Sequence, residues 1–169
     1  MTGDALWHDI TLDHFEAVRV ADGVAVRMSA NVAATLSHHA GELVRFLDAD
    51  EVPRGAFPRR TPAAATVLAR MFPDAYRSRD QARAFRERHR DRLRDSAAAR
   101  RVRDQLATAP TLVLGADDLD DWLTTFALAR FLYSRRRRRR ARFDLTAAWF
   151  AFVLDSLVLA AAPELAAQP

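Results

Sequence analysis

The sequence predicts a mainly α-helical protein, a compact bundle of about five helices with a small N-terminal β-hairpin. Three observations predict this fold. Half of the 169 residues are hydrophobic, which is enough to build the core of one domain. A short segment near the N-terminus alternates apolar and polar residues around a turn, and most of the remaining chain repeats apolar residues at helical spacing. We expect a single domain with a loosely ordered lead-in at 1–14, the hairpin at 15–28 and the bundle at 30–161.

The hairpin is expected over Phe15 to Met28. Its valines alternate with arginine and alanine, so one face of each strand is apolar. The alternating valines are Val18, Val20, Val24 and Val26. Asp22 and Gly23 form a dipeptide that is typical of a tight turn. Because an isolated hairpin is only marginally stable, we expect it to pack against the helices.

A first helix is expected over Ala30 to Leu47, with Ser29 as its N-cap. Its apolar side chains are Val32, Leu36, Leu43 and Phe46. The segment Asp48 to Arg60 contains Pro53, Gly55 and Pro58 and is predicted to be a loop. Thr61 and Pro62 are expected to start a short second helix, with threonine as the cap and proline in the first turn, and Pro73 is expected to end it.

Ser78, with Gln81 three residues later, resembles a capping box and predicts a long helix that runs to about Leu106. Its apolar stripe is thin and consists of Phe85, His89, Leu93, Val102 and Leu106. Arginines recur on one face of this helix between Arg79 and Arg94. Nearby acids neutralise part of that charge, which favours a solvated face over a nucleic-acid reader. Thr111 to Leu114 is a candidate short strand.

Two helices are expected near the C-terminus. Asp117 and Asp118 suit the first turn of a helix, because its N-terminus favours negative charge. That helix is expected to bury Leu119, Trp122, Leu123, Phe126 and Tyr133. The last helix, about Leu145 to Ala161, is apolar on nearly all sides, which predicts a central place in the core. Asp155 near its middle argues against a membrane span.

The composition excludes several classes of site. The chain has no cysteine, so disulfides, thiolate metal sites, cysteine nucleophiles and thiol switches are excluded. All 26 basic residues are arginine, and the formal net charge is +4. No glycine-rich phosphate loop or serine elbow is present. The first ten residues do not read as a secretion signal, and we therefore expect a cytoplasmic protein without a membrane segment.

The polar residues do not predict catalysis. The histidines lack a convincing metal-ligand spacing, and surface or cap positions explain them better. They are His8, His14, His38, His39 and His89. The acids at 117, 118, 120 and 121 could hold Mg²⁺, but their place at a helix start explains them more simply. We therefore expect no enzyme, no cofactor and no metal.

Six consecutive arginines precede the last helix. They are Arg135, Arg136, Arg137, Arg138, Arg139 and Arg140. One interpretation is contact with phosphates of nucleic acid or anionic lipid, or with an acidic partner. The other is a solvated connector, because like charges repel one another and resist ordering. The sequence leaves both interpretations open.

Three sequence blocks resemble a known family. They are LARMFPDAY (68–76), followed by AFR (84–86); WLTTFALARF (122–131); and AWFAFVLDSLV (148–158). Together they resemble an actinobacterial family, long carried as a domain of unknown function, that is often called AosR-like after an oxidative-stress transcriptional regulator. The resemblance covers about Phe15 to Ala161. Residues of these blocks that we expect to be structural anchors are Phe72, Pro73, Tyr76, Phe85, Arg86, Trp122, Arg130 and Trp149.

The resemblance implies a cytoplasmic protein that influences transcription, in some members together with an alternative sigma factor and in response to oxidation. The genes of relatives often lie near that of the Clp protease adaptor, which suggests a second kind of partner. The redox response is attributed to a cysteine pair, which this chain lacks, so a disulfide switch is not expected here. Ala127 stands where relatives often have asparagine, and the arginine run replaces a shorter connector.

Two functional hypotheses follow. The first is a transcription-associated regulatory protein that contacts protein, DNA or both, with Arg135 to Arg140 as the contact. Its partners would be the transcription machinery or a sigma factor. The second is a protein-interaction module linked to the Clp adaptor system with no nucleic-acid role, in which Arg77, Arg79 and Arg83 are interface residues. The last helix is in addition a candidate face for a homodimer.

Overall fold

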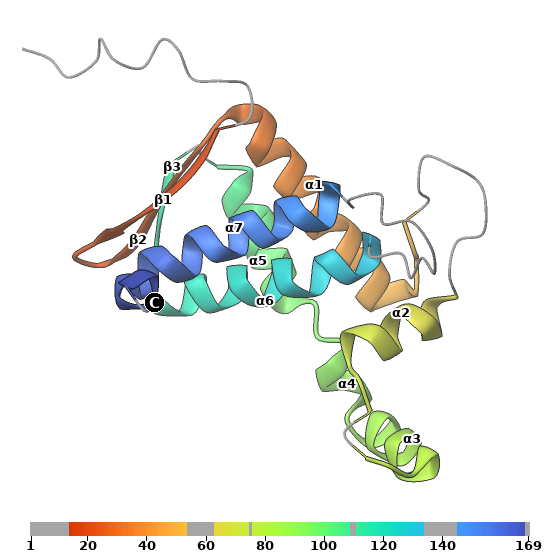
Figure 1. The fold of residues 1–169 in the computed structure, drawn as a ribbon. Coiled ribbons are helices and arrows are strands. Elements are labelled where there is room, and N and C mark those ends of the chain that lie inside the picture. The colour runs from red at the N-terminus through yellow and green to blue at the C-terminus, as the bar shows by residue number, and fades with distance from the viewer. Residues whose placement is uncertain (1–13, 54–62, 75, 109–110, 134–144, 168–169) are drawn as a thin grey trace, which may run out of the picture.

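The structure, a computed structural model, describes residues 14–53, 63–74, 76–108, 111–133 and 145–167 (Figure 1). Its elements in chain order are β1 (Phe15–Val20), β2 (Gly23–Met28), α1 (Ala30–Ala49), α2 (Ala64–Met71), α3 (Arg79–Arg88), α4 (Arg90–Leu93), α5 (Ala97–Leu106), β3 (Thr111–Leu114), α6 (Ala116–Tyr133), α7 (Leu145–Ala161) and the 3-10 turn Pro163–Ala167. The mainly α fold class with a small β element is confirmed. The arginine run and nearly all of the lead-in lie outside the described residues, and expectations for them stay predictions.

The β element is larger than a hairpin. Strands β1 and β2 pair antiparallel as predicted, and Val20 pairs with Gly23 at the turn. Strand β3 joins the other side of β2, with Val24 paired to Leu114, and the order of the sheet is β1-β2-β3. Gly23 has φ +144°, and a Cβ at this position would lie 2.0 Å from the carbonyl oxygen of Leu114. The turn therefore requires glycine at this position.

The core lies between the sheet and helices α1, α5, α6 and α7. Helix α1 packs against α5 and α6, while α7 packs antiparallel to α6 and also covers β1 (Figure 1). The largest fully buried side chains are Trp122, Phe46, Phe126, Phe150, Leu36, Leu43, Leu114 and Leu157. Of the side chains expected to be buried on α6, Trp122 and Phe126 are buried, while Leu119, Leu123 and Tyr133 are only partly buried.

Helix α1 follows its prediction closely. The side-chain oxygen of Ser29 accepts a hydrogen bond from the Val32 backbone N–H at 3.3 Å, so Ser29 is the N-cap. The helix runs two residues beyond Leu47 and ends at Asp50, which has a left-handed backbone with φ 59°. The predicted loop therefore begins at Asp50 rather than Asp48.

The prediction of one long helix from Ser78 to Leu106 is wrong, because the segment forms three separate helices, α3, α4 and α5. The backbone leaves the helical region at His89, with φ −107° and ψ 17°, and again at Arg94. Tertiary hydrogen bonds favour the second break: Arg94 bonds to Asp50, and the hydroxyl of Ser96 donates to Asp48 at 2.7 Å. These contacts with the end of α1 outweigh the helix propensity of the segment.

Three smaller predictions are also corrected. The N-cap of α2 is Ala63 rather than Thr61, and Thr61 and Pro62 themselves lie outside the described residues. Ser78 is the N-cap of α3, but its side chain makes no capping hydrogen bond, and the predicted capping box does not form. Helix α7 is not buried on every side, because Phe150 is fully buried while Phe152 is 52% exposed.

Candidate interaction surface

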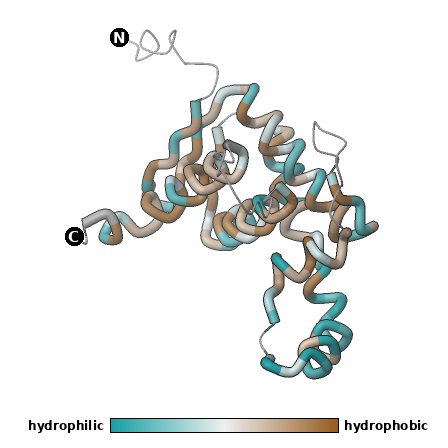
Figure 2. Tube along the Cα trace, turned by 45° about the vertical axis from the view of Figure 1, so that its right-hand side comes forward, coloured by the Kyte–Doolittle hydropathy of each residue, from teal (hydrophilic) through white to brown (hydrophobic). Residues whose placement is uncertain are grey.

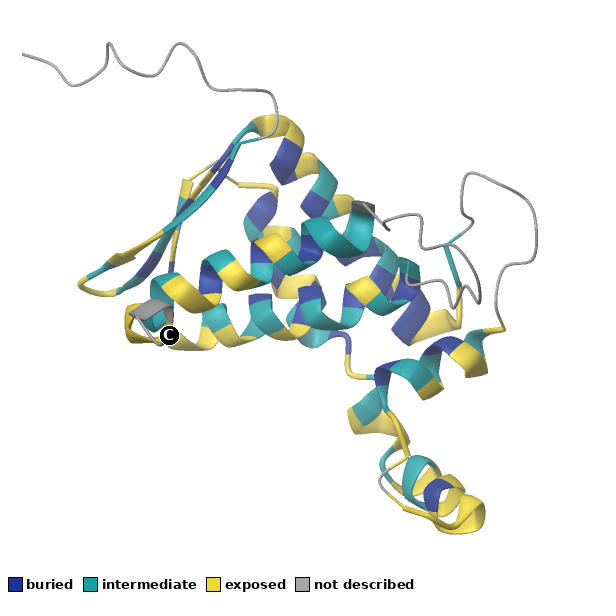
Figure 3. Ribbon diagram, viewed as in Figure 1, coloured by how far each residue is buried: buried dark blue, intermediate teal, exposed yellow. Residues whose placement is uncertain are grey.

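Helices α3 and α4 form an arm that projects from the helical body (Figure 1). We define the arm as residues 76–95. Ala82 is the single buried residue of α3, and most of the helix is exposed (Figure 3). Aromatic contacts hold the arm together: the ring of Phe85 lies 4.4 Å from that of His89 and 5.7 Å from that of Tyr76. The arm is therefore a small, polar unit with little core of its own.

The arm carries eight arginines and four acids. Three of the arginines have acidic partners: Arg83 with Asp80, Arg86 with Asp74, and Arg94 with Asp50. The remaining five are exposed and make no ion pair with any described residue. They are Arg77, Arg79, Arg88, Arg90 and Arg92. Figure 2 shows that most residues of α3 are hydrophilic. We call these five side chains the unpaired arginines of the arm.

The base of the arm is fixed to the body by charged hydrogen bonds. A guanidinium nitrogen of Arg94 lies 2.6 Å from Asp50, and another lies 3.4 Å from the carbonyl oxygen of Leu47. Just beyond the arm, Ser96 and Arg100 both donate to Asp48. Three donor side chains, Arg94, Ser96 and Arg100, thus attach the base of the arm and the start of α5 to the C-terminal end of α1.

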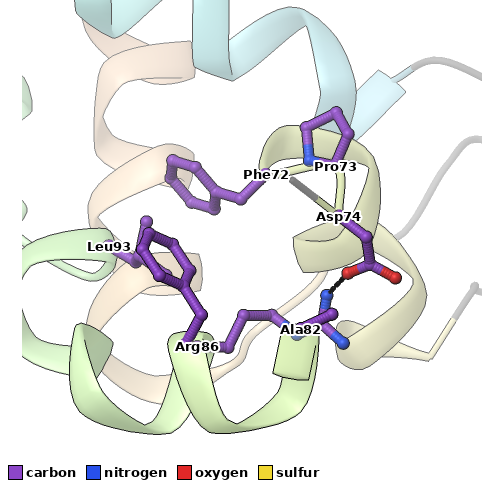
Figure 4. A pocket seen from close by; sticks show the side chains of 7 residues that line it. Phe72, Pro73, Asp74, Ala82, Arg86 and Leu93 are labelled. Atoms are coloured by element: carbon purple, nitrogen blue, oxygen red, sulfur yellow. Dashed lines mark hydrogen bonds and ion pairs between the residues drawn. The ribbon is translucent and has the colours of Figure 1, made fainter. Parts of the chain in front are cut away.

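A small pocket lies where the arm meets α2 (Figure 4). Its apolar walls are Phe72, Phe85 and Leu93, and the ion pair between Arg86 and Asp74 closes one side. Its volume of about 20 Å³ holds roughly one water molecule. This space is too small for a substrate, and we assign the pocket a packing role.

A second polar cluster joins α1, α6 and α7. The hydroxyl of Tyr133 donates to Glu42 at 2.8 Å and lies 2.7 Å from Nδ1 of His39. Since that hydroxyl proton is given to Glu42, Nδ1 of His39 is the donor in the second bond. The ring of Phe150 lies 5.1 Å from that of His39. Burial, followed by the nearby His38, lowers the pKa of His39 to about 4, and burial raises the pKa of Tyr133.

The cluster corrects the prediction that His39 is a surface or cap residue. His39 lies three residues after Leu36 and four before Leu43, on the apolar face of α1, and this spacing is the signal that could have located it. The polar side chains of the cluster have partners within the protein, and the small pocket beside the arm is lined by other residues. We therefore interpret it as a structural network that ties three helices together.

The aspartates at the start of α6 also have structural partners. Asp118 accepts a hydrogen bond from the Gln105 amide at 2.6 Å, and Asp121 receives two from Arg101. The same Gln105 accepts from the indole nitrogen of Trp122 at 2.7 Å. Within the part of the chain that the structure describes, no group of three or more His, Cys, Asp or Glu side chains could hold a metal ion.

The anchors expected from the sequence occupy different environments. Trp122 is fully buried, and Phe72 and Trp149 pack against the core while partly exposed. Tyr76 is 44% exposed, so the expectation that it anchors the core is wrong; its ring packs at a tilt against Phe85 instead. Pro73, Phe85 and Arg86 line the small pocket. Arg130 is exposed and its guanidinium lies 5.2 Å from the Phe131 ring centroid.

Comparison with protein families identifies the chain. A family model described as Domain of unknown function (DUF2017) matches residues 13–161. The chain belongs to this family. The DUF2017 match runs from β1 to the end of α7 and includes the whole arm. No curated protein and no solved structure matches the chain. Among the described residues, no helix is both long and apolar enough to cross a membrane.

Proposed function

We propose that this DUF2017 protein is a transcription-associated regulatory protein of the cytoplasm that acts by contact with another macromolecule rather than by catalysis. The observation that supports the proposal most is the arm: five exposed arginines, without acidic partners among the described residues, stand on a unit that projects from the body. Arginine is enriched at interfaces and at phosphate-binding surfaces. The resemblance to the AosR-like family supplies the link to transcription.

The arginine run Arg135 to Arg140 belongs to the same proposal, although it lies outside the described residues. It follows Tyr133, which ends α6, and precedes Leu145, which begins α7. The run carries positive charge, as the arm does. We therefore include it as a second contact for an acidic or phosphate-bearing partner. The proposed partners are the transcription machinery, including a sigma factor, and DNA.

Affinity purification from the host, with and without nuclease, tests this proposal. We expect subunits of the transcription machinery to be recovered with the tagged protein. A variant with Arg88, Arg90 and Arg92 changed to glutamine should recover several-fold less of them. Recovery of protease components alone, equally well by both proteins, contradicts the proposal and supports the alternative below.

The alternative is a protein-interaction module linked to the Clp adaptor system. One observation favours a protein partner: α7 exposes Phe152 at 52% and Leu159 at 42%, seven residues apart on one face. Exposed apolar side chains on one face are typical of protein contacts, including homodimers. Changing Phe152 and Leu159 to serine should abolish such a contact and leave partners of the arm unaffected.

A further inference from the structure

We propose that the unpaired arginines of the arm bind the phosphate backbone of double-stranded nucleic acid without reading its sequence. This inference rests on the proposed function, because it names the partner class of the proposed contact surface. It concerns five exposed residues, Arg77, Arg79, Arg88, Arg90 and Arg92. The charge of the arm, its length, the position of its acids and its lack of an exposed apolar centre all support this inference.

The charge of the chain is divided unevenly. The arm carries eight arginines against four acids, whereas the described residues outside the arm carry eight arginines against fourteen acids. Among the described residues, the excess of positive charge therefore lies on the arm, where it would attract a polyanion. Several body arginines already pair with acids, for example Arg101 with Asp121. A phosphate backbone would thus meet uncompensated positive charge at the arm.

The dimensions of the arm suit a duplex. Helix α3 has ten residues and is about 15 Å long at 1.5 Å per residue. A duplex presents one negative charge per roughly 1.7 Å of its axis, so about nine phosphates fall within that length. The arm continues beyond α3 through α4, which adds Arg90 and Arg92. The arm therefore spans a stretch of duplex that offers more phosphates than the arm has unpaired arginines.

The placement of acids on α3 favours backbone contact over base reading. Asp80 and Glu87 are seven residues apart and share a helix face. Their carboxylates would face the bases and phosphates if this face entered a groove, which would be repulsive. Arginines flank that face, with Arg79 on one side and Arg88 on the other. Phosphate contacts position a protein but carry no sequence information, so we expect binding to be independent of sequence.

An acidic protein partner fits the arm less well. The core of a protein interface is depleted of charge and enriched in aromatic residues. Tyr76 is the single large hydrophobic side chain that the described part of the arm exposes. Phe85 and Leu93 face the small pocket instead. The arm thus offers guanidinium groups without the apolar centre that a stable protein contact needs.

Fluorescence anisotropy with a labelled 20-base-pair DNA duplex of arbitrary sequence tests the inference. The parent protein has Arg135 to Arg140 changed to glutamine, so that the run cannot mask the arm. The arm variant adds Arg88→Gln, Arg90→Gln and Arg92→Gln. The control variant instead adds Arg45→Gln, Arg101→Gln and Arg103→Gln, three body arginines that already pair with acids. Both variants lose the same charge, and circular dichroism verifies their fold.

The expected result is a salt dependence that tracks the arm. For five phosphate contacts, the logarithm of affinity should fall with the logarithm of salt concentration with a slope of about −4.5, and the arm variant should bring this to about −1.8. The control variant should retain the slope of the parent. If the arm variant fails to fold, Arg77→Gln with Arg79→Gln replaces it, with an expected slope of about −2.7. A second, unrelated duplex should bind within about twofold of the first.

Three outcomes overturn the inference. The first is an arm variant whose slope equals that of the parent. The second is an equal loss of affinity in the arm and control variants, which shows that only net charge matters. The third is polyglutamate that binds as well as the duplex at equal charge concentration, which indicates an acidic protein as the partner. Recovery of transcription proteins after nuclease treatment would then still support the proposed function, so the two failures are distinguishable.

Discussion

At the scale of single residues, Tyr133 links its own helix, α6, to helices α1 and α7 of the core. Its hydroxyl donates to Glu42 on α1 and accepts from His39 on the same helix. Its ring stacks on Phe150 of α7 at 6.0 Å. This one side chain therefore carries both polar and apolar contacts between helices that are distant in sequence.

Changing Tyr133 to phenylalanine separates these contacts, because the ring remains and the hydroxyl is lost. We expect a loss of about 1–3 kcal/mol in the free energy of unfolding, since Glu42 and His39 lose a partner in a partly buried site. Urea denaturation measures it. The matched control is Tyr76→Phe, at an exposed tyrosine, which should change stability by less than about 0.5 kcal/mol. Equal effects of the two substitutions would refute the role of the cluster.

The lowered pKa of His39 predicts a pH dependence of stability. The unfolded state binds a proton on this residue below about pH 6.5, while the folded state resists protonation until about pH 4. The free energy of unfolding should thus keep its full value above pH 6.5 and should decrease as the pH is lowered from 6.5 to 4. His39→Gln cannot take up this proton, and its stability should fall less over that window. Parallel profiles of the two proteins in urea melts would contradict this account.

At the scale of elements, the break between α4 and α5 depends on contacts that no local pattern reveals. Ser96 is buried, donates to Asp48, and accepts from Arg100 at 3.1 Å. Asp48 lies 48 residues earlier in the chain, so the segment 78–106 by itself predicts a continuous helix. In contrast, β1, β2 and α1 could be predicted from sequence because their signals, Asp22-Gly23 and the Ser29 cap, are local.

A matched pair of serines tests the origin of this break. Ser96→Ala should cost about 1–3 kcal/mol, because it removes a hydrogen bond to a charged partner in a buried place. Ser78→Ala, at the N-cap of α3, should lower the free energy of unfolding by less than about 0.5 kcal/mol, since that side chain makes no capping hydrogen bond. Thermal or urea unfolding gives both values. A larger cost at Ser78 would restore the capping box that the sequence suggested.

Helix α7 shows a further limit of sequence patterns. Its apolar residues surround the helix, so the sequence cannot say which face is turned to the core. The structure buries Phe150, Val153 and Leu157 and exposes Phe152. Which side is buried depends on where α6 and β1 lie, and this is a property of the assembled fold.

Two phenylalanines of α7 test this orientation. Phe150→Ala should cost about 3–5 kcal/mol, as is typical of a large side chain lost from a packed core. Phe152→Ala, two residues away, should cost roughly 1 kcal/mol or less, because half of its surface is exposed. Urea denaturation compares them. Similar costs would show that α7 is rotated from the orientation described above.

At the scale of the whole molecule, a well-packed body, acidic over its described residues, carries a basic, weakly packed arm. The sequence favoured a solvated face for the arginines between Arg79 and Arg94, because nearby acids on the same helix were expected to neutralise part of their charge. Arg86 pairs with Asp74, 12 residues away, and Arg94 with Asp50, 44 residues away, while Arg88, Arg90 and Arg92 have no ion pair among the described residues. Which acid pairs with which arginine, when the two are far apart in sequence, is decided by the fold.

The central claim is that the arm is the surface that meets a partner, and arginine footprinting tests it most directly. An arginine-specific reagent is applied with and without duplex DNA, and mass spectrometry measures the modification of each arginine. The account predicts that DNA slows the modification of Arg88, Arg90 and Arg92 several-fold and leaves Arg45 and Arg103 unchanged. Unchanged modification of the arm, with protection confined to other arginines, would contradict it.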